Sequence, residues 1–526
     1  MRCDRTHAAQ AGRARTTPLR LGAGRRRRGR SLELGHLKLY NTRTRGVERF
    51  EPLRTGEVRI YVCGLTPSAQ AHLGHARSFL FFDVLRRYLR HRGFRVTYVQ
   101  NVTDIDDRSI NAAKESGEDY HAIVDRYYAE FKDSMRKLGV LEYDAEPYAT
   151  KFIEPIQAMI RQLIEEGHAY VSEDGIYYRV STFANYGRLA NRKLDELEAG
   201  ARIEVGEHKE DPLDFALWKF AKPAEPRWAF DPYGEGRPGW HIECSAMAHV
   251  LLDPDGTGFD IHGGGADLIF PHHENEIAQS EPLMTRPPMA NFWVHGGLLL
   301  FDNRKMAKSL GNFEPLSALL QRHDAQAIRW LFLQTGYRKV MNFTEESIAA
   351  AALGLGRVKA AYRLLARAQG GEAAGVLDLD DRMETALDDD MNTAAALAVL
   401  YDFVGNAARY ADDPALAALA FRRLGYWLGV LGIAPKDDWL EEARVDFAPD
   451  FVERLREALS EARVNGAPSV IEAATPREAI ERIVGMRDDA RRAKDWAASD
   501  RLRDALQRCG IEVKDSKEGT TWTVAG

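Results

Sequence analysis

The feature that most constrains the fold of this chain is the succession of a strand, a helix and a second strand between residues 57 and 107. The segment EVRIYVCG alternates in polarity and ends in a glycine, as a strand that enters a turn does. Apolar residues then recur at helical spacing between Gly74 and Gly93, and RVTYVQNVTDIDD has the pattern of a strand followed by an acidic loop. This βαβ order predicts a parallel sheet with binding sites at the carboxyl ends of its strands.

The later segments extend the α/β pattern and then become helical. Residues 118–168 have the pattern of two helices, AYVSEDGIYYRVS that of a hairpin, and the polar stretch up to about Pro238 that of an insertion. GWHIECSAMAHVLL and DLIFPHHENEIAQS predict helices, and FDIHGGG and NFWVHGG predict strands. Beyond about Phe313 the pattern is helical almost throughout. Its amphipathic segments are residues 344–368, 380–410 and 413–431.

The composition is that of an ordinary globular protein. Hydrophobic residues make up 45% and charged residues 29% of the 526 positions, and no apolar run reaches transmembrane length. The four cysteines, Cys3, Cys63, Cys244 and Cys509, are too few and too scattered for a disulfide framework. We therefore expect a reducing, cytoplasmic compartment and no membrane partner. Any cysteine with a function is expected to bind a metal or to take part in the chemistry.

Basic residues are concentrated in the first 36 positions, which carry ten arginines and two acids in a chain of net charge −6. This head has no apolar periodicity, so we expect it to be disordered, with folded structure beginning near Leu37. An organelle transit peptide, an arginine-rich RNA-binding arm and a start codon placed too far upstream all fit its composition.

Cys63 ends the first predicted strand and is followed, after a loop, by His72 and His75. The cysteine is a redox thiol, a metal ligand, a nucleophile or simply a buried side chain. The two histidines of HLGH lie at the mouth of a helix that starts at about Gly74, where free N–H groups and positive potential favour a phosphate. The glycine would let a nucleotide lie close to the backbone. Helix-start histidines that face solvent would show the same spacing.

A second basic motif, KMAKSLGN, follows HLGH after more than 200 residues. Lys305 and Lys308 are three positions apart beside a glycine, and could hold a triphosphate as point charges. Taken alone, a solvated basic loop explains this motif equally well. The two motifs together, joined by an α/β pattern, are far more specific.

HLGH and KMAKS resemble the HIGH and KMSKS signatures of class I aminoacyl-tRNA synthetases. YVCGLT, NVTDIDD, GWHIECSAM, DIHGGGADLIFPHHENEIAQ and NFWVHGG are similar, in this order, to segments of the cysteinyl-tRNA synthetase family. The resemblance runs from about Leu37 to the GTTW near the C-terminus. It implies a ligase that activates L-cysteine with ATP and Mg²⁺ to cysteinyl-adenylate, and then transfers the acyl group to the 3′-terminal ribose of tRNA-Cys.

The residues also suggest a zinc site. In PHHENE, His272 and Glu276 are i and i+4 on one helix face, which suits two ligands of one metal, while the i,i+3 pair His273 and Glu276 stays open. With Cys63 and Cys244 they form a plausible zinc set of two thiolates, an imidazole and a carboxylate. The resemblance implies these four ligands, one zinc per chain, and the substrate thiolate as a further ligand. A soft metal would separate cysteine from serine, which an apolar pocket distinguishes by only ~1–3 kcal/mol.

The resemblance further implies roles for the residues around ATP and cysteine. We expect six residues to bind ATP: His72, Gly74, His75, Asp267, Lys305 and Lys308. Of these, the two histidines and Lys308 would carry catalysis by stabilising the phosphates, without a covalent protein intermediate. Thr103 and Trp240 would line the cysteine pocket. Trp240 could instead be plain core and Asp267 a helix N-cap.

With this resemblance we predict an α/β fold, in which a Rossmann-type doubly wound parallel sheet contains an inserted connective domain and is followed by a helical bundle and a small C-terminal domain. The expected divisions are residues 1–36 (basic extension), 37–158 (first half of the catalytic domain), 159–235 (connective insertion), 236–300 (second half of the catalytic domain), 301–345 (KMSKS loop and stem-contact region), 346–465 (helical, DALR-like anticodon-binding bundle) and 466–526 (C-terminal anticodon-recognition domain).

Two departures and two alternatives stay open. The loop TPSAQAH lacks the tyrosine and aspartate that many relatives have there, and Ala307 replaces the serine of KMSKS. The related ligase of mycothiol synthesis makes the same adenylate but resembles only the catalytic half, whereas residues 346–526 resemble an anticodon-binding part in which Trp522 could stack on an unpaired base. A catalytically dead paralogue would be expected to lose Lys308 or a zinc ligand, and none is lost. We therefore predict an active enzyme, and with the resemblance we expect a monomer.

Overall fold

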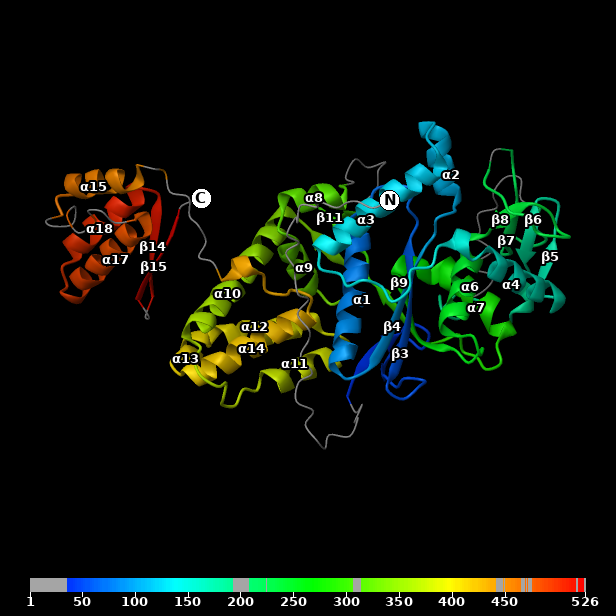
Figure 1. Cartoon of the computed structure of the whole chain (residues 1–526), viewed down its shortest axis with the longest axis horizontal. Coiled ribbons are helices and arrows are strands. Elements are labelled where there is room, and N and C mark those ends of the chain that lie inside the picture. The colour runs from blue at the N-terminus through cyan, green and yellow to red at the C-terminus, as the bar shows by residue number, and fades with distance from the viewer. Residues whose placement is uncertain are drawn as a thin grey trace, which may run out of the picture. The chain divides into compact units, whose positions relative to one another are not determined.

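Figure 1 shows a computed structural model of the chain. It describes residues 36–192, 208–223, 225–305, 314–440, 448, 450–464, 469, 471, 475–516 and 519–524. The arginine-rich head, residues 1–35, lies outside the described residues. The chain divides into two compact units, Met1–Lys436 and Asp437–Gly526, which are considered one at a time.

A four-stranded parallel sheet forms the centre of the first unit, in the order β10-β9-β3-β4. Its strands are β3 (Glu57–Leu65), β4 (Arg95–Val102), β9 (Phe259–Gly265) and β10 (Ala290–Gly296). From β3 the chain moves outward to β4, and from β9 it moves outward in the opposite direction to β10. The predicted doubly wound parallel sheet is therefore confirmed. Because the direction reverses between β3 and β9, the crevice at their carboxyl ends is where such folds bind ligands.

Helix α1 (Leu73–His91) joins β3 to β4 and packs on this sheet, as its apolar spacing predicted. The contact is close enough that a Cβ at Gly263 would lie 2.3 Å from the Phe82 ring. The first glycine of HGGG is therefore needed for the packing of α1 against β9.

The acidic loop expected after β4 is present over residues 103–106, and it leads directly into a helix. Helix α2 (Asp107–Ser116) begins at Asp106, whose side chain accepts a hydrogen bond from the Arg108 amide. An aspartate in this position is a favourable N-cap, which is why the loop ends at Asp106 and a helix follows. The two helices predicted next are present as α3 (Tyr120–Lys137) and α4 (Ile153–Glu165).

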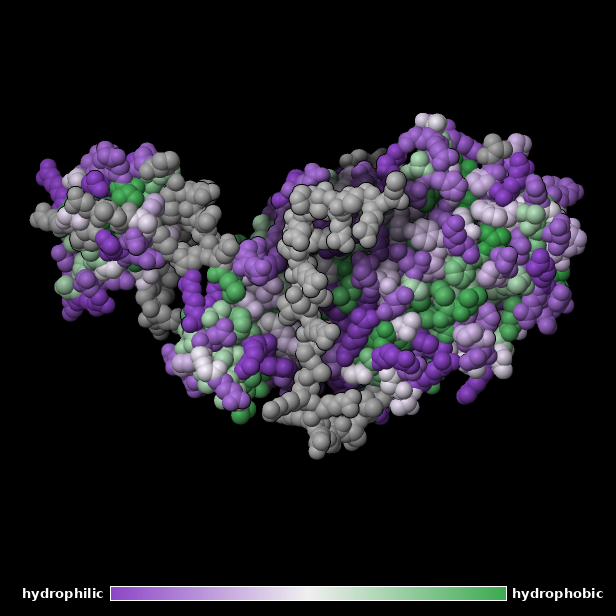
Figure 2. Space-filling model, viewed as in Figure 1, coloured by the Kyte–Doolittle hydropathy of each residue, from purple (hydrophilic) through white to green (hydrophobic). Residues whose placement is uncertain are grey.

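The insertion folds as an antiparallel sheet in the order β5-β6-β7-β8. Its strands are β5 (Ala169–Val171), β6 (Gly175–Tyr178), β7 (Phe215–Phe220) and β8 (Gly236–Pro238). The predicted hairpin is the β5–β6 pair. These strands share a core with α4 and with α6 (Trp240–Leu252), so the insertion is packed onto the helix that follows it. Figure 2 shows apolar residues gathered on the face over α6 and α7 (Glu274–Ser280), where a cavity of about 370 Å³ lies between α4 and α6.

Beyond β10 the chain forms a small three-stranded sheet and then a helical bundle. The sheet has the order β12-β11-β13, with β11 at Leu299–Phe301, β12 at Arg304–Lys305 and β13 at Met341–Phe343. Helices α8 (Leu316–Arg322) and α9 (Ala325–Leu333) separate β12 from β13. The bundle consists of α10 (Glu345–Ala368), α11 (Leu379–Asp388), α12 (Thr393–Gly405), α13 (Ala407–Ala411) and α14 (Pro414–Val430).

The predicted segment 380–410 is interrupted between α11 and α12. Asp390 and Met391 both have positive φ, which helices do not accept. The Asp390 carboxylate receives hydrogen bonds from the Tyr40 amide (2.8 Å) and the Tyr337 hydroxyl (2.8 Å). The break thus allows an acidic side chain to join the bundle to the N-terminal hairpin, β1 (Lys38–Asn41) and β2 (Gly46–Arg49).

The second unit has a core of its own. It contains α15 (Phe451–Glu461), α17 (Pro476–Arg492), α18 (Trp496–Arg508) and the antiparallel pair β14 (Ile511–Ser516) and β15 (Gly519–Val524). The expected boundary near residue 465 differs from the division after Lys436, because Phe451 and Leu455 of α15 are buried in this second core. In neither unit is any described helix long and apolar enough to cross a membrane.

Candidate functional site

Four side chains converge at the carboxyl end of β3, namely Cys63 of β3, Cys244 of α6, and His272 and Glu276 around the start of α7. One ligand atom from each lies within 4.8 Å of the others. The Cys63 Sγ is 3.7 Å from the Cys244 Sγ and 3.4 Å from the Glu276 Oε1. The His272 Nε2 is 3.1 Å from the same Glu276 oxygen. All four residues are buried, so the four expected metal ligands form one enclosed cluster.

A second donor set overlaps the first. His262 of β9 and His273 join Cys63 and Glu276 in a group whose ligand atoms also lie within 4.8 Å of one another. The His262 Nε2 is 2.8 Å from the Glu276 Oε2, and the His273 Nε2 is 3.3 Å from the Cys63 Sγ. The first set offers two sulfur atoms and the second offers one. Since the sets share Cys63 and Glu276, they describe two alternatives for one metal centre.

The segment before α7 is not the continuous helix expected from the sequence. The chain kinks at Phe270, whose backbone is extended, before His272 and His273 lead into α7. The spacing of His272 and Glu276 is kept across this junction, as the 3.1 Å contact shows. The Nε2 of the next residue, His273, contacts the Cys63 Sγ, so two consecutive histidines reach the same cluster.

The electrostatics of the cluster fit a bound cation. Burial raises the pKa of the Cys63 thiol and of the Glu276 carboxyl well above their ordinary values. Burial also lowers the pKa of His272 and His273 well below the ordinary value for histidine. A divalent metal would favour the deprotonated thiols and carboxylate and use the neutral imidazoles as they are. The donor chemistry, two thiols with an imidazole and a carboxylate, is compatible with zinc.

Further histidines hold the rings that face the cluster. The Nδ1 atoms of His241 and His272 are 2.9 Å apart, and the His273 Nδ1 is 2.8 Å from the His295 Nε2. The His295 Nδ1 is in turn 2.8 Å from the Thr42 hydroxyl. Burial lowers the pKa of His241 and His295 to about 3, so both rings are neutral. Such outer partners orient the rings that face a metal.

The HLGH motif caps helix α1. The His72 Nδ1 accepts a hydrogen bond from the Gly74 amide (3.0 Å), and the His75 Nδ1 accepts one from the His72 amide (3.2 Å). The two rings stack with centroids 3.9 Å apart. Burial lowers the pKa of both rings, that of His75 to about 3. Because each neutral ring accepts at Nδ1, its proton is on Nε2, which is therefore a hydrogen-bond donor at the helix N-terminus.

The glycines near this helix start have structural reasons as well as the expected functional ones. A Cβ at Gly74 would lie 2.8 Å from the His72 ring, so the glycine makes room for the capping imidazole. Asp267 lies in the 3₁₀ turn Ala266–Leu268, whose N-cap is Gly265, so the alternative that Asp267 is an N-cap does not hold. The Asp267 charge acts on His72, which places this carboxylate beside the HLGH motif.

Trp240 and Thr103 lie near the metal-ligand cluster. The Trp240 ring centroid is 4.4 Å from that of His272, and the Arg108 guanidinium is 5.5 Å from the Trp240 centroid. Thr103 directly follows β4 and accepts a hydrogen bond from the Asn101 side chain (3.2 Å). Trp240 also lines a cavity of about 440 Å³ between the start of α2 and strands β7 and β8, so it is not plain core. The charged residues that line this cavity are Asp106, Asp107, Arg108, Lys209, Lys219 and Arg237.

Of the two lysines of KMAKS, the structure describes only the backbone of Lys305. The backbone of Lys305 ends strand β12 and pairs with Leu300 of β11. Lys308 and Ala307 lie outside the described residues, so the expected roles of these positions stay predictions.

Sequence reasoning missed several residues of this site. His241, His262 and His295 were present in the motifs GWHIEC, DIHGGG and WVHGG, which already suggested the catalytic half of the chain. His295 near the end of a strand and His241 near the start of a helix were usable signals, whereas His262 lies in the middle of β9. Arg108 gave none, because it lies just beyond the predicted acidic loop and belongs to no motif that the sequence singled out.

Comparisons with known proteins agree with this geometry. Residues 49–353 match the family model of the class I tRNA synthetase (C) catalytic domain. The chain is 45% identical over 494 residues to the cysteine–tRNA ligase of Pseudomonas paraeruginosa, an alignment that covers 93% of this chain and all of that protein. The chain belongs to the cysteinyl-tRNA synthetase family. The cysteine–tRNA ligase of Methylococcus capsulatus is likewise 45% identical, over 92% of this chain and 99% of that protein.

The second half of this family member also matches known domains. Residues 382–435 match the DALR domain, and residues 477–522 match the cysteinyl-tRNA ligase anticodon binding domain. Among solved structures, Mycobacterium tuberculosis methionyl-tRNA synthetase in complex with methionyl-adenylate aligns with a TM-score of 0.51 at 15% identity. That alignment covers 72% of this chain and 90% of the other. At this identity the likeness concerns the fold, which is that of a class I synthetase.

Proposed function

We propose that this class I synthetase activates L-cysteine with ATP and transfers the cysteinyl group to the 3′-terminal ribose of tRNA-Cys, as a cytoplasmic monomer. The observation that carries the proposal is the buried convergence of Cys63, Cys244, His272 and Glu276 beside Trp240. This donor set occurs in a chain that aligns with cysteine–tRNA ligases over nearly its whole length.

These four residues would hold one zinc ion. Zinc bound there would supply a soft Lewis acid that takes up the substrate thiolate and leaves the alcohol of serine unbound. The first donor set is favoured over the second because it contributes two thiolates, which a soft metal prefers. The neutral imidazoles of His241 and His295 would keep the inner rings in place.

The substrate side of the site would be formed by Trp240 and Thr103. Trp240 is half-buried and faces both His272 and the adjoining cavity, so its ring can cover a small amino acid. Thr103 is held by Asn101, at the end of the strand next to Cys63. Together they would orient the cysteine carboxylate toward ATP while the side chain points to the metal ligands.

The nucleotide would lie at the start of α1. The Nε2–H groups of His72 and His75 would donate hydrogen bonds to phosphate oxygens, and the positive end of the helix would add to this. Asp267 and Gly74 would contact the nucleoside side, and Mg²⁺ would accompany ATP. Lys305 and Lys308 would hold the β- and γ-phosphates as point charges. The residues of this chain thus position and stabilise the substrates: the cysteine carboxylate attacks the α-phosphorus of ATP as the bond to pyrophosphate breaks, and the ribose hydroxyl of tRNA then takes the acyl group and releases AMP.

The C-terminal part supports tRNA as the acceptor. The match of residues 477–522 to an anticodon binding domain argues against the mycothiol-type ligase, which resembles only the catalytic half. In this unit Trp496 is 60% exposed at the start of α18, whereas Trp522 is partly buried against the core of the unit. Trp496 is therefore the better candidate to stack on a base.

The test is cysteinylation of a tRNA-Cys transcript with ATP and Mg²⁺, together with a control that lacks tRNA. We expect charged tRNA with cysteine and none with serine. Adenylate turnover without charged tRNA would instead favour a different acceptor. If folded protein loaded with zinc forms neither charged tRNA nor adenylate, the proposal is refuted.

A further inference from the structure

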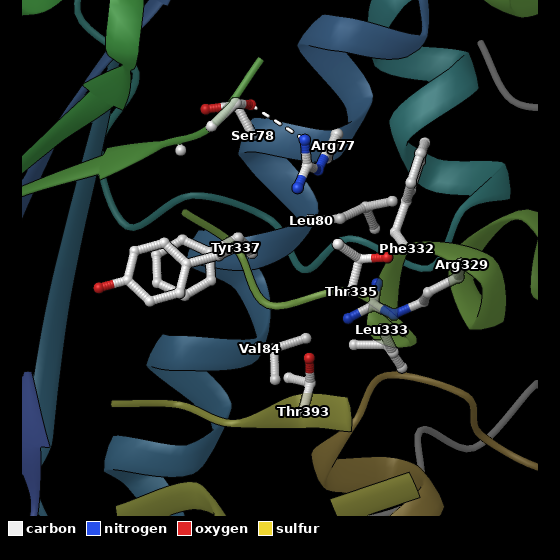
Figure 3. Close-up of a pocket in the computed structure, with 13 residues that line it drawn as sticks. Arg77, Ser78, Leu80, Val84, Arg329, Phe332, Leu333, Thr335, Tyr337 and Thr393 are labelled. Atoms are coloured by element: carbon white, nitrogen blue, oxygen red, sulfur yellow. Dashed lines mark hydrogen bonds between the residues drawn. The ribbon is translucent and has the colours of Figure 1, made fainter. Parts of the chain in front are cut away.

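One arginine of helix α1 makes contacts that the proposed chemistry does not use. Arg77 lies two residues after His75 and is only 6% exposed. Its guanidinium donates to four backbone carbonyls, those of Gly297 (3.1 Å), Leu298 (2.7 Å), Gly336 (3.4 Å) and Lys339. Figure 3 shows Arg77 between the backbone of one strand connection and the segment that carries Tyr337.

These carbonyls belong to the two segments that lead into the β12-β11-β13 sheet. Residues 297–298 connect β10 to β11, and residues 336–339 connect α9 to β13. Strands β11 and β13 pair with each other in parallel, so both enter the small sheet at the same end. Arg77 therefore bonds both entrances of this sheet to helix α1.

The two segments are also closely packed on each other. The Gly297 amide donates to the Tyr337 carbonyl (2.7 Å), and the Met341 amide donates to the Leu298 carbonyl (3.0 Å). A Cβ at Gly297 would lie 2.4 Å from the Arg338 carbonyl oxygen. One helical turn beyond Arg77, Phe81 stacks on Tyr337 with ring centroids 3.9 Å apart and an interplanar angle of 12°. A movement of either segment relative to α1 would break several of these contacts together.

The guanidinium does not have room for a ligand here. The cavity beside it, drawn in Figure 3, has a volume of about 30 Å³ and is lined by Arg77, Ser78, Phe81, Arg329, Thr335 and Tyr337 among others. Such a volume holds a water molecule or two and no substrate. The four carbonyls are thus the partners of this cation, and a planar fork of donors suits them better than an ammonium would.

We propose that Arg77 is a positioning residue for adenylate formation: it holds the β12-β11-β13 sheet at a set distance from the histidines that begin α1. This inference rests on the proposed function, in which His72 and His75 contact the phosphates from one side. Strand β12 ends at Lys305, the first lysine of KMAKS. The orientation of this sheet therefore sets the position of the Lys305 backbone. Arg77 touches no substrate and acts only through these backbone segments.

The test compares Arg77→Ala and Arg77→Lys with Arg86→Ala. Arg86 is a matched control because it is a fully buried arginine of the same helix that also donates to backbone carbonyls, those of Leu141 and Glu142. These carbonyls lie before α4 and do not belong to the small sheet, and Arg86 also pairs with Asp83 of its own helix, so its loss is expected to affect stability. For each variant we would measure cysteine-dependent ATP–pyrophosphate exchange below the unfolding temperature, and amide hydrogen exchange of residues 297–301 and 336–343.

We expect Arg77→Ala to lower kcat of the exchange reaction by about 100-fold, since small misplacements distant from the reacting atoms have effects of this size. The KM for cysteine should stay unchanged, because the metal-ligand cluster is separate. Hydrogen exchange should rise in both segments. Arg77→Lys keeps the positive charge but not the planar set of donors, so it should lower kcat less than Arg77→Ala does. Arg86→Ala should be less stable but kinetically normal.

Normal kcat in Arg77→Ala would overturn the inference, and so would a loss of kcat without faster hydrogen exchange in either segment. An equal loss of kcat in Arg86→Ala would also overturn it, because the effect would then reflect general destabilisation. If the unmodified protein showed no cysteine-dependent exchange, the proposed function itself would fail, and the role of Arg77 in that reaction would fail with it.

Discussion

Replacing Cys244 with serine distinguishes the two overlapping donor sets of the metal-ligand cluster. Cys63 and Glu276 belong to both sets, Cys244 and His272 to the first only, and His262 and His273 to the second only. If the first set holds zinc, Cys244→Ser removes one of two thiolates and one of four ligands. If the second set holds zinc, the same substitution removes no ligand.

The magnitude follows from the number of ligands. Structural zinc sites with four ligands have apparent binding free energies of about 10–16 kcal/mol, or about 2.5–4 kcal/mol per ligand if they are shared equally. Loss of one ligand should therefore weaken zinc binding by about two to three orders of magnitude. His262→Asn is the control, because His262 contacts Glu276 at 2.8 Å and would then count only as an outer partner. Such partners contribute about 10–100-fold.

Two assays report on this prediction. Competition with a chromophoric chelator gives the zinc affinity of each variant. Substitution with Co²⁺ gives a thiolate-to-metal charge-transfer absorption whose intensity depends on the number of bound thiolates. We expect Cys244→Ser to halve this absorption and His262→Asn to leave it unchanged. If His262→Asn instead bound zinc more weakly than Cys244→Ser, and Cys244→Ser kept the full absorption, the first donor set would be refuted and the metal would be assigned to the second.

Three further predictions concern other parts of the molecule. His75→Asn should lower the rate of pyrophosphate exchange by about 10²–10³-fold with an unchanged KM for cysteine, and a normal rate would exclude His75 from the phosphate site. Burial alone would raise the pKa of Asp83, but Arg329, Arg87 and Arg86 outweigh it and hold the pKa well below the ordinary value. Asp83→Ala should therefore cost about 3–5 kcal/mol of stability near neutral pH. Because the folded pKa is the lower one, this contribution is present above the unfolded pKa of about 3.9 and is lost as the pH falls below it, which thermal unfolding at several pH values would check. Trp496→Ala should weaken tRNA binding by about 1–3 kcal/mol, measured by filter binding, and should leave tRNA-independent exchange intact. An equal loss of tRNA binding and of pyrophosphate exchange would indicate misfolding and would contradict a specific role of Trp496.

The elements that local patterns predicted correctly are those whose residues are neighbours in sequence. The alternation of EVRIYVCG and the helical spacing after Gly74 correspond directly to β3 and α1. The i,i+4 spacing of His272 and Glu276 brought two donors together because one turn of chain separates them.

Local patterns were insufficient where a signal had two meanings or where distant residues decided the outcome. The aspartates of DIDD suit a loop and an N-cap equally well, and the structure uses Asp106 as an N-cap. The break after α11 depends on Asp390 and its bonds to Tyr40 and Tyr337, neither of which is near it in sequence. The division of the C-terminal part depends on which core the apolar face of α15 joins, and amphipathic spacing cannot specify that.

The sequence by itself determined the order of the elements, the family, and the four residues expected to bind zinc, because short-range periodicity and long unusual motifs carry this information. Only the tertiary structure decided that His262 and His273 form a competing donor set, that further histidines hold the inner rings, and that Arg77 binds two strand entrances. Cys63 and Cys244 are 181 positions apart, yet their sulfur atoms lie 3.7 Å from each other. Such contacts depend on the order of strands in the sheet and on which helix faces pack together, and these are properties of the whole fold.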